Sequence, residues 1–153
     1  MNCAYYNTSF GLFKIVESDG AITAIDYVRE VKRSEPSLLT DLAAHQLEEY
    51  FQGVRKGFEL PLNPRGTEFQ KKVWQELLKI PFGQIRTYGQ IAAAIERPKG
   101  ARAVGMACHN NPVMIVIPCH RVVGANGQLT GYAGGLDIKK RLLEIEGAGD
   151  QII

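Results

Sequence analysis

The sequence predicts an α+β fold with two domains, a small N-terminal α/β domain followed by a mainly helical one. Three observations carry this prediction: β-rich runs lie in the first third, helix signals dominate the second half, and a segment with two prolines lies between them. Residues 60–66 contain these prolines and a glycine, so they sustain neither a helix nor a central strand. We therefore expect one domain over residues 1–65 and a second over residues 66–153.

Short β-rich runs open the chain. Residues 10–17 and 21–28 are joined by Ser18-Asp19-Gly20, and Asp-Gly between two such runs is a strong hairpin signal. Residues 3–8 offer a further strand. Apolar side chains then recur at helical spacing over residues 36–52, which predicts a helix that completes an α/β module.

The second domain opens with helix signals. Thr67 and Thr87 are each followed three residues later by glutamine, the pattern of a capping box at a helix N-terminus. The first of these helices is expected to end before Pro81, and a further short helix is expected over residues 101–109. Two short helices around a tight turn are typical of a helix-turn-helix motif.

Strand signals return near the C-terminal end. A strand over residues 113–117 is expected to lead into Pro118-Cys119-His120. Residues 122–123 and 128–130 then flank an Asn-Gly turn, which predicts a small hairpin like the wing of a winged helix. A last helix is expected to start at an Asp137 cap.

The charge is unevenly distributed between the two predicted domains. Residues 1–65 hold 7 Lys and Arg against 9 Asp and Glu, whereas residues 66–153 hold 11 against 7. A basic second domain suits a polyanion such as a nucleic acid, although a solvated surface often shows the same bias. The charge alone therefore leaves both interpretations open.

Composition places the chain among soluble globular proteins. It has 153 residues, of which 45% are hydrophobic and 22% charged, and its longest apolar run is too short to span a bilayer. The N-terminus lacks the pattern of an export signal. Cys3, Cys108 and Cys119 are then expected to be free thiols in a reducing compartment. We expect a cytoplasmic protein with no membrane partner.

The adjacent residues Cys119, His120 and Arg121 are the main candidates for chemistry. A thiol with an ordinary pKa of about 8.5 needs a neighbouring base or cation to react at neutral pH, and His120 and Arg121 offer both. The alternative is that Cys119 is a small buried hydrophobe. A papain-type hydrolase fits poorly, since adjacent side chains rarely point the same way, but a water between thiol and imidazole removes that objection.

A zinc site is a second alternative. The pairs Cys108-His109 and Cys119-His120 offer four ligands, but adjacent residues cannot easily chelate one ion. We predict no metal.

Other polar and apolar side chains admit simpler interpretations. Glu146, in the last turn of the final helix, is either a solvated charge or an acid that orients an imidazole. Arg102 is either a surface arginine or a residue that reaches into DNA. Met106 and Trp74 are expected in the core.

These motifs together closely resemble the O6-alkylguanine-DNA alkyltransferases, or methylated-DNA-protein-cysteine methyltransferases. The resemblance covers about residues 67–148, whereas residues 1–65 match only in general outline. It is carried by separated motifs in the right order, at residues 102–105, 111–112, 118–122, 131–135 and 142–147. It implies a ribonuclease-H-like N-terminal domain and a winged helix-turn-helix domain.

The resemblance also implies a reaction. The family's cysteine takes an alkyl group from O6 of guanine in a single irreversible turnover, which makes Cys119 the acceptor. His120 would deprotonate Cys119 through a water, Glu146 would hold and polarise the imidazole, and Asn111 would brace the turn that carries the cysteine. No cofactor is implied.

DNA contacts follow from the same resemblance. The reacting base must be flipped out of the duplex, and Arg102 would fill the gap it leaves. Tyr88 would help to rotate the nucleotide and polarise the base. Ala101 and Gly105 lie in the same predicted helix as Arg102. We expect these residues to contact DNA.

The flipped base would enter a pocket. Val122 would read guanine through a backbone carbonyl, Tyr132 would stack on the base, and the Ala133 backbone N–H would lie near O6. Cys108 occupies a position that is apolar in some relatives, so it is either packing or a second thiol that senses the pocket.

The expected partner is double-stranded DNA that contains O6-alkylguanine. We expect a monomer, and leave open whether neighbouring molecules bind DNA cooperatively and whether O4-alkylthymine is also a substrate. Some relatives hold zinc in the N-terminal domain, but Cys3 and His45 are too few for a four-ligand site. The rival hypothesis is a winged-helix module that senses alkylation without turnover.

Overall fold

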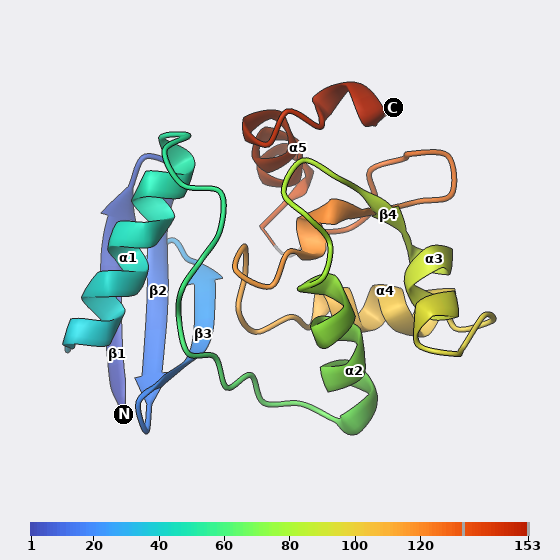
Figure 1. Ribbon diagram of the computed structural model, residues 1–153. Coiled ribbons are helices and arrows are strands. Elements are labelled where there is room, and N and C mark those ends of the chain that lie inside the picture. Colours follow the sequence, from blue (N-terminus) through green and yellow to red (C-terminus); the bar gives the residue numbers. More distant parts are fainter. Residues whose placement is uncertain (133, 153) are drawn as a thin grey trace. The chain divides into compact units, whose positions relative to one another are not determined.

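The computed structural model describes residues 1–132 and 134–152 (Figure 1). By contact it divides into two compact units. One unit comprises residues 1–65 with residues 112–116, and the other comprises residues 66–111 with the chain from Ile117 onward. The first is built on a sheet and the second is mainly helical, so the predicted α+β class is confirmed.

The first unit contains a three-stranded antiparallel sheet. Its strands β1 (Asn2–Thr8), β2 (Gly11–Ser18) and β3 (Ala21–Tyr27) lie in chain order. The predicted hairpin is present between β2 and β3, where Asp19 and Gly20 have φ of 52° and 80°. Two successive positive φ values match the right-handed twist of the strands, which explains the Asp-Gly pair.

One helix, α1 (Leu38–Phe51), packs against this sheet. Ser37 and Thr40 form a capping box at its start. Phe51 stacks on Phe10, with ring centroids 4.4 Å apart, and also contacts Phe13 on β2. Because Phe13 and Leu47 are fully buried, these side chains form the core between helix and sheet.

Residues 113–117 do not form the predicted strand. Ile25 on β3 donates its N–H to Pro112 O and accepts from Met114 N, which is only an isolated bridge. Ile115 then turns the chain with φ of 75°, a conformation that a β-branched residue rarely adopts. Residues 113–117 are buried, as expected of an apolar run, but their backbone is bent rather than extended.

The described residues of the second unit contain four α-helices. They are α2 (Glu68–Leu77), α3 (Tyr88–Ala94), α4 (Ala101–His109) and α5 (Leu136–Ile145). The two predicted capping boxes are confirmed, since Thr67 and Thr87 each accept from the N–H three residues on at 3.1 Å. The Trp74 indole donates to Ala107 O at 2.9 Å, so Trp74 is in the core as predicted.

The start of α5 differs from the prediction. Gly135, with φ of 99°, is the N-cap and makes no side-chain cap, whereas Asp137 lies inside the first turn. The predicted Asp137 cap is therefore wrong. Its carboxylate still lies near the positive end of the helix dipole, where it is stabilising.

The predicted wing hairpin also pairs differently. The strand β5 (Val122–Val123) pairs in parallel with β4 (Arg86–Thr87), not with residues 128–130. Gly124 N donates to Gln128 O at 2.8 Å, so the Asn-Gly segment forms a closed turn without a second strand. The partner of Val122 lies more than thirty residues away in sequence, which no local signal reveals.

No helix among residues 1–132 and 134–152 is long and apolar enough to cross a bilayer. Within the same residues, His, Cys, Asp and Glu side chains do not gather in groups of three or more that could hold a metal ion.

Candidate functional site

The candidate nucleophile lies on a short 3-10 turn, Cys119–Arg121. A 3-10 turn rotates successive side chains by about 120°, so neighbours in sequence meet different partners. All three side chains are buried, with exposed fractions of 5% for Cys119, 0% for His120 and 8% for Arg121. Three buried polar groups in a row require dedicated partners.

Asn111 holds the cysteine. Its Nδ2 lies 2.8 Å from Ile117 O and 3.2 Å from Cys119 Sγ, so the amide donates toward both. Asn111 follows α4, and its own N–H bonds to Cys108 O. The residue expected to brace the turn therefore contacts both the turn and the sulfur.

Burial raises the pKa of the Cys119 thiol, because a thiolate is poorly solvated in an apolar environment. The hydrogen bond from Asn111 and the positive charge of Lys139 act in the opposite direction. Without help the thiol stays protonated at neutral pH, so its reaction needs a base.

A carboxylate links the next two residues. Glu146, at the end of α5, places Oε2 2.8 Å from His120 Nε2. Arg121 donates to both carboxylate oxygens, at 2.8 and 2.9 Å, and to Ile80 O at 2.7 Å. Gly83 N adds a fourth donor to Glu146. Glu146 is therefore buried and bonded to the imidazole, as in the hypothesis of an acid that orients it, and is not a solvated charge.

The cluster fixes protonation states. Burial would raise the pKa of Glu146, but hydrogen bonds from His120 and Arg121 outweigh burial and hold it well below its usual range. Burial lowers the pKa of His120, with Glu146 opposing. His120 is therefore neutral near pH 7, donates through Nε2 to the carboxylate, and can accept a proton at Nδ1.

Arg121 does not serve the thiol as the sequence suggested. It forms a bidentate pair with Glu146, 25 residues further on. The signal that could have found this role is its position beside the apolar pair Val122-Val123, since a buried arginine must have an anionic partner.

Lys139 is a site residue that the sequence prediction missed. Its side chain is fully buried, and Nζ donates to Thr130 O at 3.0 Å and lies 5.8 Å from the centre of the Tyr88 ring. Burial lowers its pKa, while the two nearby thiols Cys108 and Cys119 raise it. Its helical spacing from the buried Leu142, Leu143 and Glu146 was the available signal.

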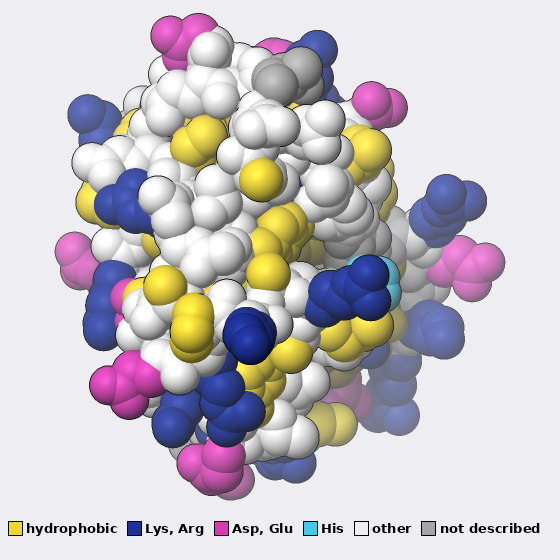
Figure 2. Space-filling model, turned by 90° about the vertical axis from the view of Figure 1, so that its right-hand side faces the viewer, with side chains coloured by type: hydrophobic (Ala, Val, Ile, Leu, Met, Phe, Trp, Pro, Cys, Tyr) yellow, Lys and Arg dark blue, Asp and Glu magenta, His cyan; other side chains and the backbone are white. Residues whose placement is uncertain are grey.

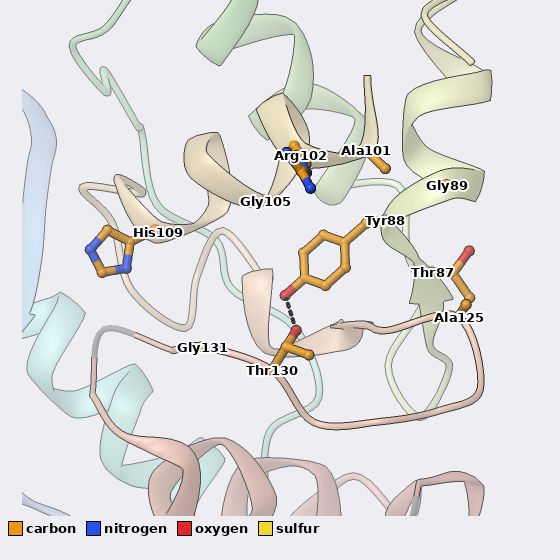
Figure 3. Close-up of a pocket in the computed structure, with 10 residues that line it drawn as sticks. All are labelled: Thr87, Tyr88, Gly89, Ala101, Arg102, Gly105, His109, Ala125, Thr130 and Gly131. Atoms are coloured by element: carbon orange, nitrogen blue, oxygen red, sulfur yellow. Dashed lines mark hydrogen bonds between the residues drawn. The ribbon is translucent and has the colours of Figure 1, made fainter. Parts of the chain in front are cut away.

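A cavity of about 530 Å³ opens in the second unit (Figure 3). The four residues predicted to contact DNA all line it: Arg102, Tyr88, Ala101 and Gly105. The Tyr88 ring lies between Arg102 and Thr130, and Thr130 Oγ1 donates to the Tyr88 hydroxyl at 2.9 Å. The remaining lining residues are Thr87, Gly89, His109, Ala125, Thr130 and Gly131.

The residues predicted for the base pocket are placed differently from those predicted to contact DNA. Val122, Tyr132 and Cys108 are buried, with exposed fractions of 9% or less, and are not among the lining residues described for this cavity. Ala133 lies outside the described residues. Tyr88 connects the two regions, because it lines the cavity and a negative charge on Cys108 or Cys119 would raise the pKa of its hydroxyl.

One face of α4 is exposed. Arg102, Met106 and His109 lie on it at helical spacing, and Met106 is 60% exposed. The prediction that Met106 is in the core is therefore wrong, because α4 buries Val104, Ala107 and Cys108 on its other side. Figure 2 shows hydrophobic, Lys and Arg side chains and a histidine together on one face of the molecule. The sequence prediction missed His109 as a cavity residue.

Two family models match the chain. The model described as 6-O-methylguanine DNA methyltransferase, DNA binding domain, matches residues 68–148, and the model described as its ribonuclease-like domain matches residues 1–64. Together they span most of both units.

Named relatives and solved structures agree. A methylated-DNA–protein-cysteine methyltransferase of Methanosarcina acetivorans is 49% identical over 94% of this chain and 85% of its own length. A constitutive enzyme of that name from Bacillus subtilis is 46% identical over 93% and 94%. The structure of Mycobacterium tuberculosis OGT in complex with DNA matches with a TM-score of 0.89 and 37% identity, over 99% of this chain and 95% of that one. The chain therefore belongs to the 6-O-methylguanine DNA methyltransferase family, as its motifs predicted.

Proposed function

We propose that this protein repairs DNA by moving an alkyl group from O6 of a flipped-out guanine onto Cys119, once per molecule. Family membership gives the reaction class, the direct transfer of an alkyl group from DNA to protein. The observation that carries the assignment to Cys119 is its setting: a buried sulfur held by Asn111, followed in the chain by the His120, Glu146 and Arg121 cluster.

The proposed chemistry is a single displacement. His120 takes the thiol proton through a bridging water, and the sulfur attacks the alkyl carbon. A C–S bond forms, the C–O6 bond breaks, and its electron pair remains on guanine. Glu146 stabilises the imidazolium that results, and Arg121 keeps the carboxylate ionised and oriented. Asn111 and Lys139 stabilise the thiolate that forms in the buried site.

The DNA contacts are assigned to the cavity. An atom inside the base stack cannot be reached in a duplex, so the nucleotide must be extruded. Arg102 is exposed at the cavity, where it can occupy the space the nucleotide vacates, and Tyr88 lies beside it. The small residues Ala101 and Gly105 allow a backbone to approach α4 closely.

The finer features are proposals as well. We assign duplex DNA containing O6-alkylguanine as the partner, a monomer as the active form and the cytoplasm as the location. The three free cysteines favour a reducing compartment. Val122, Tyr132, Ala133 and Cys108 are proposed to surround the base beyond Tyr88.

Titration of a damaged duplex tests this function. Increasing amounts of protein are mixed with a duplex that contains one O6-methylguanine, and the lesion that remains is counted. We expect one lesion lost per protein molecule, with no loss for Cys119→Ser and an unchanged endpoint for Cys108→Ser. Binding without lesion loss would favour the rival module that only senses alkylation.

A further inference from the structure

We propose that Thr130 is a positioning residue for the alkyl transfer, because its hydroxyl holds and supports the Tyr88 phenol while the phenol gives its proton to the departing guanine. This inference rests on the proposed function and deepens it. Thr130 has no part in the proposed activation of the thiol or in the proposed DNA contacts, so this role is an additional one.

The contact itself is well defined. Thr130 Oγ1 donates to the Tyr88 hydroxyl at 2.9 Å, and the two side chains meet across the cavity wall (Figure 3). Tyr88 is the first residue of α3, directly after the Thr87 cap, so its backbone is fixed. The side chain of Lys139 is fully buried, and its Nζ donates to Thr130 O at 3.0 Å, so the backbone of Thr130 is held in place as well.

The direction of the hydrogen bond matters for the chemistry. When Thr130 donates, the Tyr88 oxygen is the acceptor, and its own proton points away from Thr130. The phenol proton can then be aimed at a base that enters the cavity. If the phenol were the donor instead, its proton would be held by Thr130 and withheld from the base.

The proton is needed by the leaving group. Breaking the C–O6 bond leaves its electron pair on the purine, and a proton on a ring nitrogen converts this anion to neutral guanine. As Tyr88 gives up that proton, negative charge grows on its oxygen, and a hydrogen bond to a charged acceptor is stronger than one to a neutral acceptor. Solvent water then reprotonates Tyr88, and His120 returns its proton to solvent, so alkyl and hydrogen are exchanged overall.

The surroundings make such support useful. Burial raises the pKa of Tyr88, and the hydrogen bond from Thr130 acts in the opposite direction. Cys108 and Cys119 also raise it, Lys139 lies over its ring, and Arg102 and His109 line the same cavity. Without the Thr130 hydroxyl the phenol is a weaker acid, since the charged form loses its donor.

Thr130→Val separates this role from a structural one. Valine keeps the shape of threonine, and the bond from Lys139 is to the backbone carbonyl, so it survives the change. We expect the maximal single-turnover rate on a duplex containing O6-methylguanine to fall about tenfold, with unchanged DNA affinity and with recovery in Thr130→Ser.

A double-mutant cycle gives the decisive comparison. If Thr130 acts through Tyr88, then Thr130→Val has no further effect on the rate once Tyr88→Phe has removed the phenol oxygen. An equal loss in both backgrounds would overturn the proposal, as would a Thr130→Val variant that reacts like the wild type or that only binds DNA more weakly.

A change of leaving group provides an independent readout. O6-benzylguanine leaves as a purine anion, whereas 2-amino-4-benzyloxy-6-chloropyrimidine leaves as a less basic one that needs a proton less. The loss caused by Thr130→Val should be smaller on the chloropyrimidine, and an equal loss on both counts against the proposal. A wild-type protein that takes no alkyl group from any substrate refutes the proposed function instead, so the two failures are distinguishable.

Discussion

The environment of Cys119 is set by residues outside its own 3-10 turn as well as by its neighbour His120. Burial raises the pKa of its thiol, whereas the hydrogen bond from Asn111 and the positive charge of Lys139 lower it, and His120 is the proposed base. The combination of a hydrogen-bond donor, a buried cation and a neighbouring imidazole distinguishes the site from that of an ordinary buried cysteine.

Loss of the Asn111 amide should slow the reaction. Asn111→Ala removes the donor to Cys119 Sγ and to Ile117 O, so we expect alkyl transfer to slow by about tenfold to a hundredfold, the worth of a hydrogen bond to a charged group. Single-turnover kinetics measure the rate. The matched control is the exposed neighbour Asn110→Ala, and equal rates for the two variants contradict the role of Asn111.

Loss of the Glu146 charge should change stability in a pH-dependent way. Because its folded pKa is depressed, Glu146 stabilises the fold above its ordinary pKa of about 4.3, and this stabilisation is lost as pH falls toward the folded value. We expect Glu146→Gln to cost about 3–5 kcal/mol at neutral pH, since Arg121 is left buried and uncompensated, and the difference from wild type to shrink below about pH 4.

Thermal unfolding across that pH range measures both quantities. Glu144→Gln, at an exposed position of the same helix, is the control and should stay close to wild type at every pH. A Glu146→Gln difference that does not change with pH would mean that the carboxylate charge is not the source of the stability.

At the scale of elements, α3 begins at Tyr88, a proposed DNA contact, so we expect its N-cap to affect both stability and repair. Thr87→Ala removes the cap of α3 and Thr67→Ala the equivalent cap of α2, with the same 3.1 Å bond lost in each. We expect each to lose about 1 kcal/mol in denaturant unfolding. Only Thr87→Ala should also slow repair, and an equal slowing by both shows that the position of α3 is not special.

The same elements show how far the sequence alone reaches. The hairpin at Asp19-Gly20 and the caps at Thr67 and Thr87 were predictable, because each depends on residues within one turn. The bend at Ile115 was not, since the residues just before it, 112–114, are held by a bridge to Ile25, which is far away in the sequence.

The candidate site divides in the same manner. Cys119 and His120 were found from their adjacency, and Glu146 and Asn111 from family resemblance. The roles of Arg121 and Lys139 were missed because both side chains point to partners that only the folded chain brings close. Their positions within buried, apolar patterns were the available signal, but charged residues are usually exposed, so neither was expected to be buried.

For the whole molecule, we propose that binding and flipping of DNA are separate from the chemistry on sulfur. Arg102→Ala should slow repair of a duplex by about tenfold or more, yet leave the reaction with free O6-benzylguanine nearly unchanged, since only the duplex requires base flipping. Lys79→Ala, a cation paired with Glu76, is the control for lost charge. Equal slowing on both substrates would rule out an intercalating role for Arg102. The affinity of the wild type and of both variants for DNA should fall as salt is added.

The mass of the peptide that carries Cys119 shows whether this residue is the alkyl acceptor. The protein is mixed with a duplex containing O6-methylguanine, digested and analysed by mass spectrometry. We expect one added methyl group on the Cys119 peptide, none on the peptides carrying Cys3 or Cys108, and no more than one methyl per molecule. An unmodified Cys119 peptide after the lesion has disappeared, or a methyl group on Cys108, would contradict this expectation.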